Sequence, residues 1–259
     1  MLDETDSLHG ENDQTERRSI MLVTHCWRYS KVLRYQLSSL VLEPPQGCQV
    51  TARIFYCEED RPTAELLGMY ETDNSVLKIV ADALDKPALL HRAIGRNIAA
   101  LETQADIVWF TDADYCFGPG CLDALAALEL PEDKHLFYPR RVQISINHDI
   151  GNEYTLGDPE LAVVDIDPAD FHTEVLRKAI GGVQIVRGDT ARELGYCPDT
   201  DYQRPVQGDK FKRNWADIEY RRILHRHYGD NFTARIDLPN LYRIRQKFGV
   251  VDSLVAGDS

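Results

Sequence analysis

Short runs rich in apolar residues alternate with segments of helical periodicity through the first half of this chain, and this alternation constrains the fold more than any other feature. Runs of strand length occur at residues 20–23, 50–57, 76–80 and 107–110. Segments with helical spacing follow them at residues 30–42, 61–70, 88–101 and 119–128. Strands and helices in such alternation form a mainly parallel sheet with right-handed crossovers. We therefore expect an α/β fold, with a mainly parallel sheet flanked by helices in a single domain.

The second half of the chain is less regular. We expect one or two strands over 136–146, a loop over 147–168, a helix over 171–179, a strand over 183–186, a short helix over 190–194, a helix over 214–227 and a last strand over 236–242. Residues 1–18 carry many charges and few apolar side chains, which is typical of a disordered acidic tail. Residues 247–259 are expected to form a C-terminal tail, which leaves residues 19–246 as the folded domain.

The composition excludes several classes of protein. With 259 residues, of which 43% are hydrophobic, the chain can bury a substantial core. Its formal net charge of −13 argues against binding to nucleic acid or to an anionic lipid surface. No run of about 18 apolar residues is present, so we expect no integral membrane segment. The N-terminus lacks the basic start and apolar stretch of a signal peptide, which predicts a cytoplasmic protein, either free or docked peripherally at the inner face of a membrane.

The cysteines do not have the spacing of a metal site. The six are Cys26, Cys48, Cys57, Cys116, Cys121 and Cys197, and none forms a C-x-x-C pair. Cys116 and Cys121 are separated by a Gly-Pro-Gly turn, which is poor zinc spacing. Without a secretory signal we expect free thiols in a reducing compartment, the alternative being a disulfide or metal role for one pair.

Two carboxylates follow the fourth apolar run. Asp112 and Asp114 are separated by one residue, so on an extended backbone their side chains point to the same side. At about 5 Å and an effective dielectric constant of about 20, their repulsion is about 3 kcal/mol. No Arg or Lys lies nearby in the chain, and a divalent cation such as Mg²⁺ or Mn²⁺ would neutralise the pair. The alternative is a pair of solvated loop aspartates or a helix N-cap.

Polar residues also follow the first two apolar runs. Active groups of parallel sheets lie at the carboxyl ends of the strands. This rule places residues 25–29, 58–60 and 112–114 near one crevice. Glu58 and Asp60 suit hydrogen bonds from a ribose or a base edge, the alternative being a charged surface turn.

Two pairs of arginines suit phosphate. Arg92 and Arg96 are four residues apart and share one helix face. Arg243 and Arg245 flank Ile244 in an extended segment, where both side chains would point at a diphosphate. The alternative for each pair is a solvated surface charge.

Two further segments have both a structural and a functional interpretation. Gly181 and Gly182 allow the backbone to approach a ligand closely, or form a plain turn. Asp217 lies in the first turn of the expected helix over 214–227, beside Trp215. Apolar surroundings tend to raise a carboxylate pKa and suit it to act as a base, whereas a first-turn acid also favours the helix dipole.

Taken together, these segments resemble the GT-A glycosyltransferases, and within them the large family 2. The resemblance covers about residues 20–245 and rests on six elements in order: residues 20–24 with Arg28 and Tyr29; the acids at 58–60; Gly95-Arg96-Asn97, similar to an A-R-N element; Phe110-Thr111-Asp112-Ala113-Asp114, similar to the D-x-D motif; Gly181-Gly182 with Arg187 and Leu194-Gly195; and Trp215 to Glu219, similar to the W-x-D-x-D/E element.

The resemblance implies transfer of a sugar, of the hexosyl type, from a nucleotide diphosphate to an acceptor hydroxyl. Asp217 would be the catalytic base, and inversion by single displacement is expected. Mn²⁺ or Mg²⁺ would be bound by Asp114, with Asp112 on the metal or the ribose. The implied nucleotide-sugar contacts are Thr24, Arg28, Glu58, Asp60, Arg96, Asp112, Gly182, Arg243 and Arg245. The acceptor is open between a saccharide, a lipid-linked molecule and a small molecule.

The sequence departs from the family pattern at the metal shell. Many relatives place a histidine near the C-terminus as a further metal ligand, and here Gln246 stands at that place. His225 or His227 is the alternative third ligand. The residue before the expected base is usually acidic, and here it is Ala216.

Other functions remain as alternatives. A sugar nucleotidyltransferase usually has a Gly-rich, basic loop after the first strand, where this chain reads Thr-His-Cys-Trp-Arg-Tyr over residues 24–29. A non-catalytic nucleotide-sugar-binding protein would be favoured if Asp217 pointed away from the crevice. A retaining mechanism is compatible with the D-x-D motif. A nicotinamide-dependent oxidoreductase is disfavoured, because no G-x-G-x-x-G follows the first strand.

Overall fold

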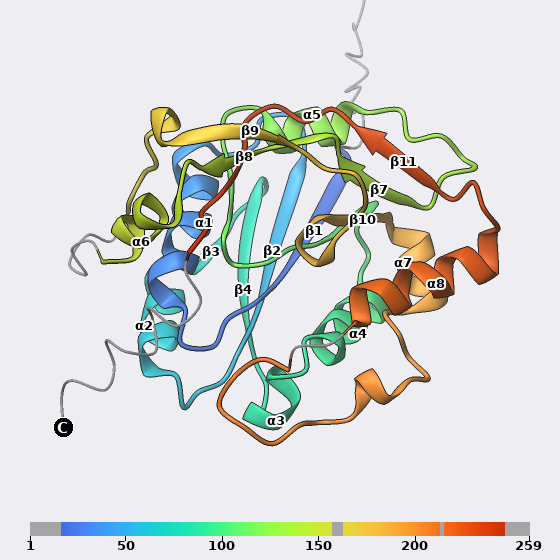
Figure 1. Cartoon of the computed structure of the whole chain (residues 1–259), viewed down its shortest axis with the longest axis horizontal. Coiled ribbons are helices and arrows are strands. Elements are labelled where there is room, and N and C mark those ends of the chain that lie inside the picture. Colours follow the sequence, from blue (N-terminus) through green and yellow to red (C-terminus); the bar gives the residue numbers. More distant parts are fainter. Residues whose placement is uncertain (1–16, 157–162, 213–214, 247–259) are drawn as a thin grey trace, which may run out of the picture.

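The computed structural model describes residues 17–156, 163–212 and 215–246, in which eight strands form the central sheet (Figure 1). Its strand order is β11 (Thr233–Ile236), β7 (Leu136–Pro139), β10 (Gln184–Arg187), β5 (Ile107–Phe110), β1 (Ser19–His25), β2 (Gln49–Tyr56), β4 (Leu77–Ala83) and β3 (Thr72–Asp73). Strands β5, β1, β2 and β4 are parallel, as the sequence predicts. β10 enters antiparallel between β5 and β7.

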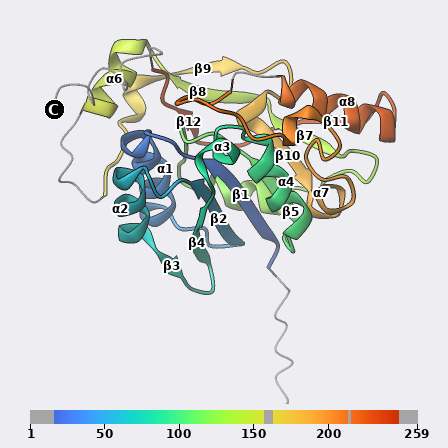
Figure 2. The same ribbon diagram turned by 90° about the horizontal axis from the view of Figure 1, so that it is seen from below.

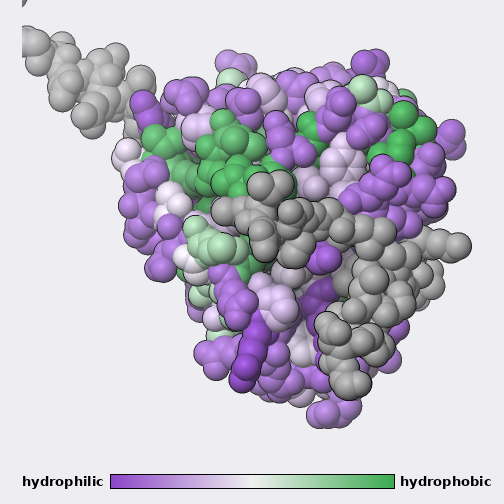
Figure 3. Space-filling view, turned by 90° about the vertical axis from the view of Figure 1, so that its left-hand side faces the viewer, coloured by the Kyte–Doolittle hydropathy of each residue, from purple (hydrophilic) through white to green (hydrophobic). Residues whose placement is uncertain are grey.

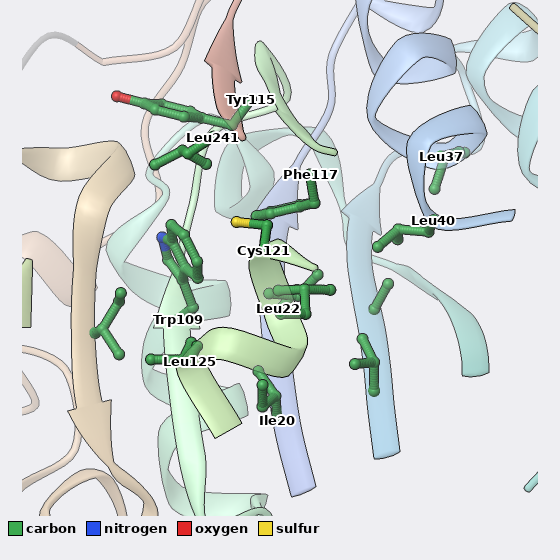
Figure 4. Close-up of a cluster of buried hydrophobic side chains, with 14 of the residues drawn as sticks. Ile20, Leu22, Leu37, Leu40, Trp109, Tyr115, Phe117, Cys121, Leu125 and Leu241 are labelled. Carbon is green, nitrogen blue, oxygen red and sulfur yellow. The ribbon is translucent and has the colours of Figure 1, made fainter. Parts of the chain in front are cut away.

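Helices cover both faces of this sheet (Figure 2). One face packs against α1 (Ser30–Leu42), α2 (Arg61–Tyr70) and α5 (Cys121–Ala127). The other packs against α3 (Lys86–Leu89), α4 (Ala93–Glu102), α7 (Gly188–Leu194) and α8 (Ala216–Tyr228). Because alternate side chains of a strand point to opposite faces, Leu22 of β1 enters the first cluster and Val23 the second. Figure 4 shows part of the first cluster, with Tyr115 at its edge and the Tyr115 hydroxyl directed away from the other labelled side chains.

A second sheet positions the segment after β5. In the described residues it has four strands, in the order β6 (Tyr115–Phe117), β12 (Leu241–Arg243), β8 (Arg141–Ser145) and β9 (Phe171–Val175). β12 is antiparallel to β6, and their register places Arg243 opposite Tyr115. The Ile244 amide also donates to the Asp114 carbonyl at 2.8 Å. The C-terminal strand therefore lies directly beside the D-x-D segment.

Several expected elements are different in the structure. The helix expected over 88–101 is split into α3 and α4, because the Lys212 amide takes the Leu90 carbonyl that a continuous helix would use. The helix expected over 171–179 is wrong: β9 pairs along β8, so strand pairing overrides local helical spacing. The last strand expected over 236–242 is two strands, β11 and β12, in different sheets.

The loop expected over 147–168 is also wrong in part. It contains α6 (His148–Leu156) and a 3₁₀ helix at Pro168–Asp170. The Asn147 side chain accepts from the Ile150 amide at 2.9 Å, which caps the start of α6. Two more 3₁₀ helices lie at Gly181–Val183 and Asp201–Gln203.

The face on the side of α1, α2 and α6 shows mainly hydrophilic residues, with one larger gathering of hydrophobic ones (Figure 3). The six cysteines are buried and free, which confirms the prediction of free thiols. No helix in the described part of the chain is both long and apolar enough to cross a membrane. The tails expected at residues 1–18 and 247–259 lie outside the described residues, apart from Arg17 and Arg18.

Candidate active site

A cavity of about 240 Å³ lies beside the carboxyl end of β5. Its lining comes from α4, the D-x-D segment, the Gly181–Val183 turn and the start of α8. The lining residues are Arg92, Ala93, Arg96, Asp112, Tyr115, Ile180, Gly181, Gly182, Tyr196, Ala216, Asp217 and Arg243. Five of the residues expected in the site therefore meet here: Arg96, Asp112, Gly182, Asp217 and Arg243.

Asp112 is held by two arginines of one helix face. Its Oδ1 accepts from Arg92 Nη1 at 3.1 Å and from Arg96 Nη2 at 3.2 Å. Burial, the largest single influence, raises the pKa of Asp112, but Arg92, Arg96 and Arg243 outweigh it and lower the pKa below the ordinary value. Asp112 is therefore held in its ionised form.

Asp114 has a different partner. Its Oδ2 accepts from Arg243 Nε at 2.9 Å. Its Oδ1 is buried and has no hydrogen-bond partner among the described residues. Burial raises the pKa of Asp114 and the charge of Asp112 adds to this, while Arg243 acts in the opposite direction. An oxygen that is buried without a donor is a natural place for a cation.

The sequence predicted that Asp112 and Asp114 lie on an extended backbone, but in the structure they lie in a turn. The Tyr115 amide donates to the Asp112 carbonyl at 3.3 Å, which closes a turn. The side chains of Asp112 and Asp114 therefore reach different arginines, and Asp114 is not among the residues that line the cavity. The neutralising charge comes from α4 and β12, which are distant in sequence, so the local sequence did not reveal it.

A buried glutamine holds this turn, and sequence reasoning missed it. Gln36 of α1 donates from Nε2 to the carbonyls of Asp112 at 2.9 Å and Tyr115 at 3.1 Å. Its Oε1 accepts from the hydroxyl of Thr24 at 2.8 Å. A polar residue on the otherwise apolar face of residues 30–42 was the signal that could have identified it. Thr24 was expected to contact the nucleotide-sugar donor. In the structure its hydroxyl is bonded to Gln36, so it supports the turn through this side chain.

A glycine is needed at position 182 because the backbone passes close to two site residues, Tyr115 and Asp112. A Cβ built there would lie 2.5 Å from Cε2 of Tyr115 and 2.9 Å from Oδ2 of Asp112. The Gly182 carbonyl also accepts from the Trp109 indole at 3.2 Å. The sequence suggested that the backbone at Gly181 and Gly182 approaches a ligand closely. In the structure the backbone at Gly182 approaches the D-x-D segment.

Asp217 lies in the first turn of α8 and faces the same cavity. A chain of hydrogen bonds connects its backbone to the arginines. Arg96 donates to the Tyr196 hydroxyl at 3.0 Å, this hydroxyl donates to Gln184 Oε1 at 2.8 Å, and Gln184 Nε2 donates to the Asp217 carbonyl at 3.0 Å. Tyr196 and Gln184 are buried and were also missed by sequence reasoning.

The first two strand ends lie outside this cavity. Asp60 is buried, and its Oδ2 accepts from the Arg28 amide at 2.5 Å and from the Thr63 hydroxyl at 2.6 Å. Its carboxylate thus fixes the loops after β1 and β2. Glu58 is exposed, as is Arg28, whose guanidinium lies 5.1 Å from the Trp27 ring centroid.

The C-terminal arginines diverge instead of pointing together. Arg243 faces the cavity, whereas Arg245 pairs with Glu174 of β9 at 2.7 Å. The alternative metal ligands are also placed elsewhere: His225 pairs with Asp230 and His227 with Glu193.

The donor set around Asp112 and Asp114 fits a divalent cation only if the substrate supplies further ligands. Within the described ranges no group of three or more His, Cys, Asp or Glu side chains gathers as a metal site. The Gln246 carboxamide is buried with neither atom partnered in that part of the chain. The unpartnered Asp114 Oδ1 nevertheless offers a hard oxygen of the kind that Mg²⁺ and Mn²⁺ prefer, and these ions commonly complete their shell with phosphate oxygens and water.

Comparisons with known proteins support the fold. No family model matches the chain, and no curated protein matches its sequence. A solved structure of a mannosyltransferase from Pyrobaculum calidifontis, in complex with GDP-Man and Mn²⁺, is similar at a TM-score of 0.52 and 13% identity, over 91% of this chain and 59% of that one. Glucosyl-3-phosphoglycerate synthase from Mycobacterium tuberculosis, in complex with phosphoglyceric acid, matches over 92% of this chain and 75% of that one at 14% identity, with a TM-score of 0.46.

The chain therefore spans less than two thirds of the mannosyltransferase that it resembles. At these identities the likeness concerns the backbone. With the mainly parallel sheet, the second sheet and the D-x-D segment between them, it shows that this chain has the fold of a GT-A-type glycosyltransferase.

Proposed function

We propose that this protein is a glycosyltransferase that moves a sugar, of the hexosyl type, from a nucleotide diphosphate to an acceptor hydroxyl, with the help of Mn²⁺ or Mg²⁺. The observation that carries the proposal is one cavity lined by Asp112, Asp217 and three arginines, one of which, Arg243, pairs with Asp114 and its carboxylate, otherwise unpartnered in the described part of the chain. Neither carboxylates nor arginines alone would suit a metal-bound diphosphate, whereas this combination does.

The donor's diphosphate would lie against Arg92, Arg96 and Arg243. Arg92 has a side chain that is 40% exposed, so it can turn toward an incoming phosphate, while Arg96 is fixed deep in the site at 5%. Asp114, with Asp112, would hold the cation. When bound, this cation supplies a Lewis acid that stabilises the negative charge of the departing diphosphate. Arg28 and Glu58, exposed at the ends of β1 and β2, are the proposed base and ribose contacts.

Asp217 is the proposed general base. The acceptor oxygen attacks the anomeric carbon, the bond from that carbon to the diphosphate oxygen breaks, and the hydroxyl proton moves to the Asp217 carboxylate. This single displacement inverts the anomeric configuration. The position of Asp217 in the cavity lining favours the catalytic alternative over a protein that only binds nucleotide sugars.

The acceptor class is left open between a saccharide, a lipid-linked molecule and a small molecule. A cytoplasmic location, free or docked at a membrane, is part of the proposal. The six free thiols support this location. The acidic charge disfavours nucleic acid as a partner.

The proposal is tested by a thermal-shift screen of ADP, CDP, GDP, UDP and dTDP with and without MnCl₂. We expect a rise in melting temperature for one base that requires the metal, because binding to the native state stabilises it. No shift with any diphosphate, in either condition, would contradict the proposed donor.

A further inference from the structure

Arg243 makes a contact that is hard to reconcile with a permanent role at the phosphate. Its Nε donates to Asp114 Oδ2, and it is the one guanidinium nitrogen of Arg243 with a hydrogen-bond partner among the described residues. The pairing of β12 with β6 fixes this contact, because it sets Arg243 opposite Tyr115, the next residue after Asp114. The guanidinium carbon also lies 5.3 Å from the centroid of the Tyr115 ring. A cation held in place by strand pairing thus occupies the carboxylate that the proposed metal needs.

We propose that Arg243 is an internal counter-ion of Asp114 that exchanges with the divalent cation: as the cation binds Asp114, the guanidinium leaves the carboxylate and turns into the cavity toward the donor diphosphate. This inference rests on the proposed function and adds to it a coupling between metal and donor.

The exchange follows from the charges at one small carboxylate. A divalent cation on the free Oδ1 would lie within a few ångströms of a guanidinium bonded to Oδ2, and like charges in such a buried place repel strongly. Asp112 offsets only part of the added charge, since Arg92 and Arg96 already share its Oδ1. This repulsion favours the departure of one of the two cations from Asp114.

The cavity shows where the displaced guanidinium can go. Arg243 lines the cavity, whereas Asp114 does not, so the arginine already borders the space expected for the diphosphate. A buried guanidinium without a counter-ion is costly, and a phosphate oxygen would restore one. The cation alone is thus predicted to bind weakly, and the diphosphate to strengthen its binding.

The other two arginines pair with Asp112 and not with Asp114, so the exchange does not involve them. Arg96 also donates to the Tyr196 hydroxyl and to the Thr111 carbonyl at 3.3 Å, which holds it in place. The guanidinium carbon of Arg92 lies 5.0 Å from the Phe211 ring centroid. Arg92 also donates to Asp112, the carboxylate that Arg96 neutralises as well. Arg243 is therefore the positioning residue through which the metal and the donor are coupled.

The test measures binding of Mn²⁺ alone to the full chain, by the loss of the free-ion signal in electron paramagnetic resonance. The Arg243→Gln variant should bind Mn²⁺ about tenfold more tightly than the wild type, because the competing charge is gone. Arg243→Lys, which keeps the charge, should remain close to the wild type. Arg245→Gln is the matched control: it lies two residues away, pairs with Glu174 and should leave Mn²⁺ affinity unchanged.

The outcomes separate this inference from the proposed function. Tighter binding in Arg243→Gln, abolished when Asp114→Asn is added, supports the exchange. Binding to the wild type that needs Asp114 but is unchanged or weaker in a folded Arg243→Gln overturns the exchange and leaves the proposed metal site standing. If neither protein binds Mn²⁺, both the exchange and the metal site are wrong. Circular dichroism of each variant shows that it is folded.

Discussion

Gly182 and Asp112 approach so closely that a Cβ atom at residue 182 would lie 2.9 Å from the Asp112 Oδ2. The same Cβ would be still closer to the Tyr115 ring, which belongs to the buried core. The buried Tyr115 ring cannot retreat without disturbing the turn that carries the D-x-D carboxylates. The absence of a side chain at this glycine is therefore part of the site.

Gly182→Ala should damage the site through this clash. We expect a loss of about 1–3 kcal/mol in the free energy of unfolding, as for other overpacked positions, together with weaker binding of the nucleoside diphosphate found in the thermal-shift screen. Chemical denaturation and calorimetry measure the two effects. Gly181→Ala is the control, because its nearest contacts would be the ordinary distances of 3.8 Å to Asp217 Cβ and 3.9 Å to Arg96 Nη1. Equal behaviour of the two variants would contradict the argument.

Gln36→Met should loosen the D-x-D turn without changing any charge. The substitution keeps the length of the side chain but leaves the Asp112 and Tyr115 carbonyls and the Thr24 hydroxyl without their partner. We expect a cost of about 2–4 kcal/mol in the free energy of unfolding, since buried polar groups are left unsatisfied, and weaker Mn²⁺ binding in the variant that remains folded. Gln49→Met, on an exposed position of β2, should change neither quantity. Unaltered stability of Gln36→Met would exclude the supporting role of Gln36.

The sequence predicts those parts of the fold whose local pattern agrees with their environment. The runs that become β1 and β5 are recognisable because strands covered on both faces need apolar side chains on both sides. In β2 and β4 buried residues alternate with more exposed ones, which is the pattern of strands with one buried face. β9 is missed because it lies at the edge of the second sheet. Its extended structure comes from pairing with β8, which the local sequence pattern does not show. The helix α6 is missed because Gly, Asp and Asn residues obscure it.

The same distinction applies to the candidate site. Asp112, Gly182 and Asp217 are found from local motifs, and the structure brings them to one cavity. The partners that neutralise the carboxylates are not visible locally, since Arg243 lies 129 residues from Asp114. Arg243 and Arg245 look equivalent in sequence and separate only because β9 offers Glu174 to one of them.

His25 should make the stability of the protein depend on pH. Both ring nitrogens are buried without a hydrogen-bond partner in the described residues, and the ring stacks on Phe55 at 5.0 Å. Burial lowers the pKa of His25 well below the ordinary histidine value of 6.5, and the charges of Arg96 and Arg92 lower it further. Below pH 6.5 the unfolded chain therefore binds a proton at His25, whereas His25 stays neutral in the folded protein. The stabilising effect is complete above pH 6.5 and is lost as the pH falls below it toward the lowered folded-state pKa.

The measurement is the free energy of unfolding between pH 7.5 and pH 5. Once His25 is protonated in the unfolded chain and still neutral in the folded protein, the free energy of unfolding falls by about 1.4 kcal/mol per pH unit. His25→Gln should remove this part of the slope, whereas His172→Gln, at an exposed position of β9, should retain it. An identical slope in the wild type and His25→Gln would show that His25 is not the group responsible.

Asp217→Asn should separate binding from chemistry. The amide is nearly isosteric with the carboxylate and keeps the backbone contact with Gln184, but it cannot accept the acceptor's proton. We expect unchanged donor affinity by calorimetry and a rate of sugar transfer, or of donor hydrolysis where no acceptor is supplied, that falls about 10²- to 10⁴-fold. Glu219→Gln is the matched control on the same helix, since that carboxylate pairs with Arg222 and Arg226 and does not line the cavity. Near-normal turnover of Asp217→Asn would remove this residue from the mechanism while leaving the metal and diphosphate site untouched.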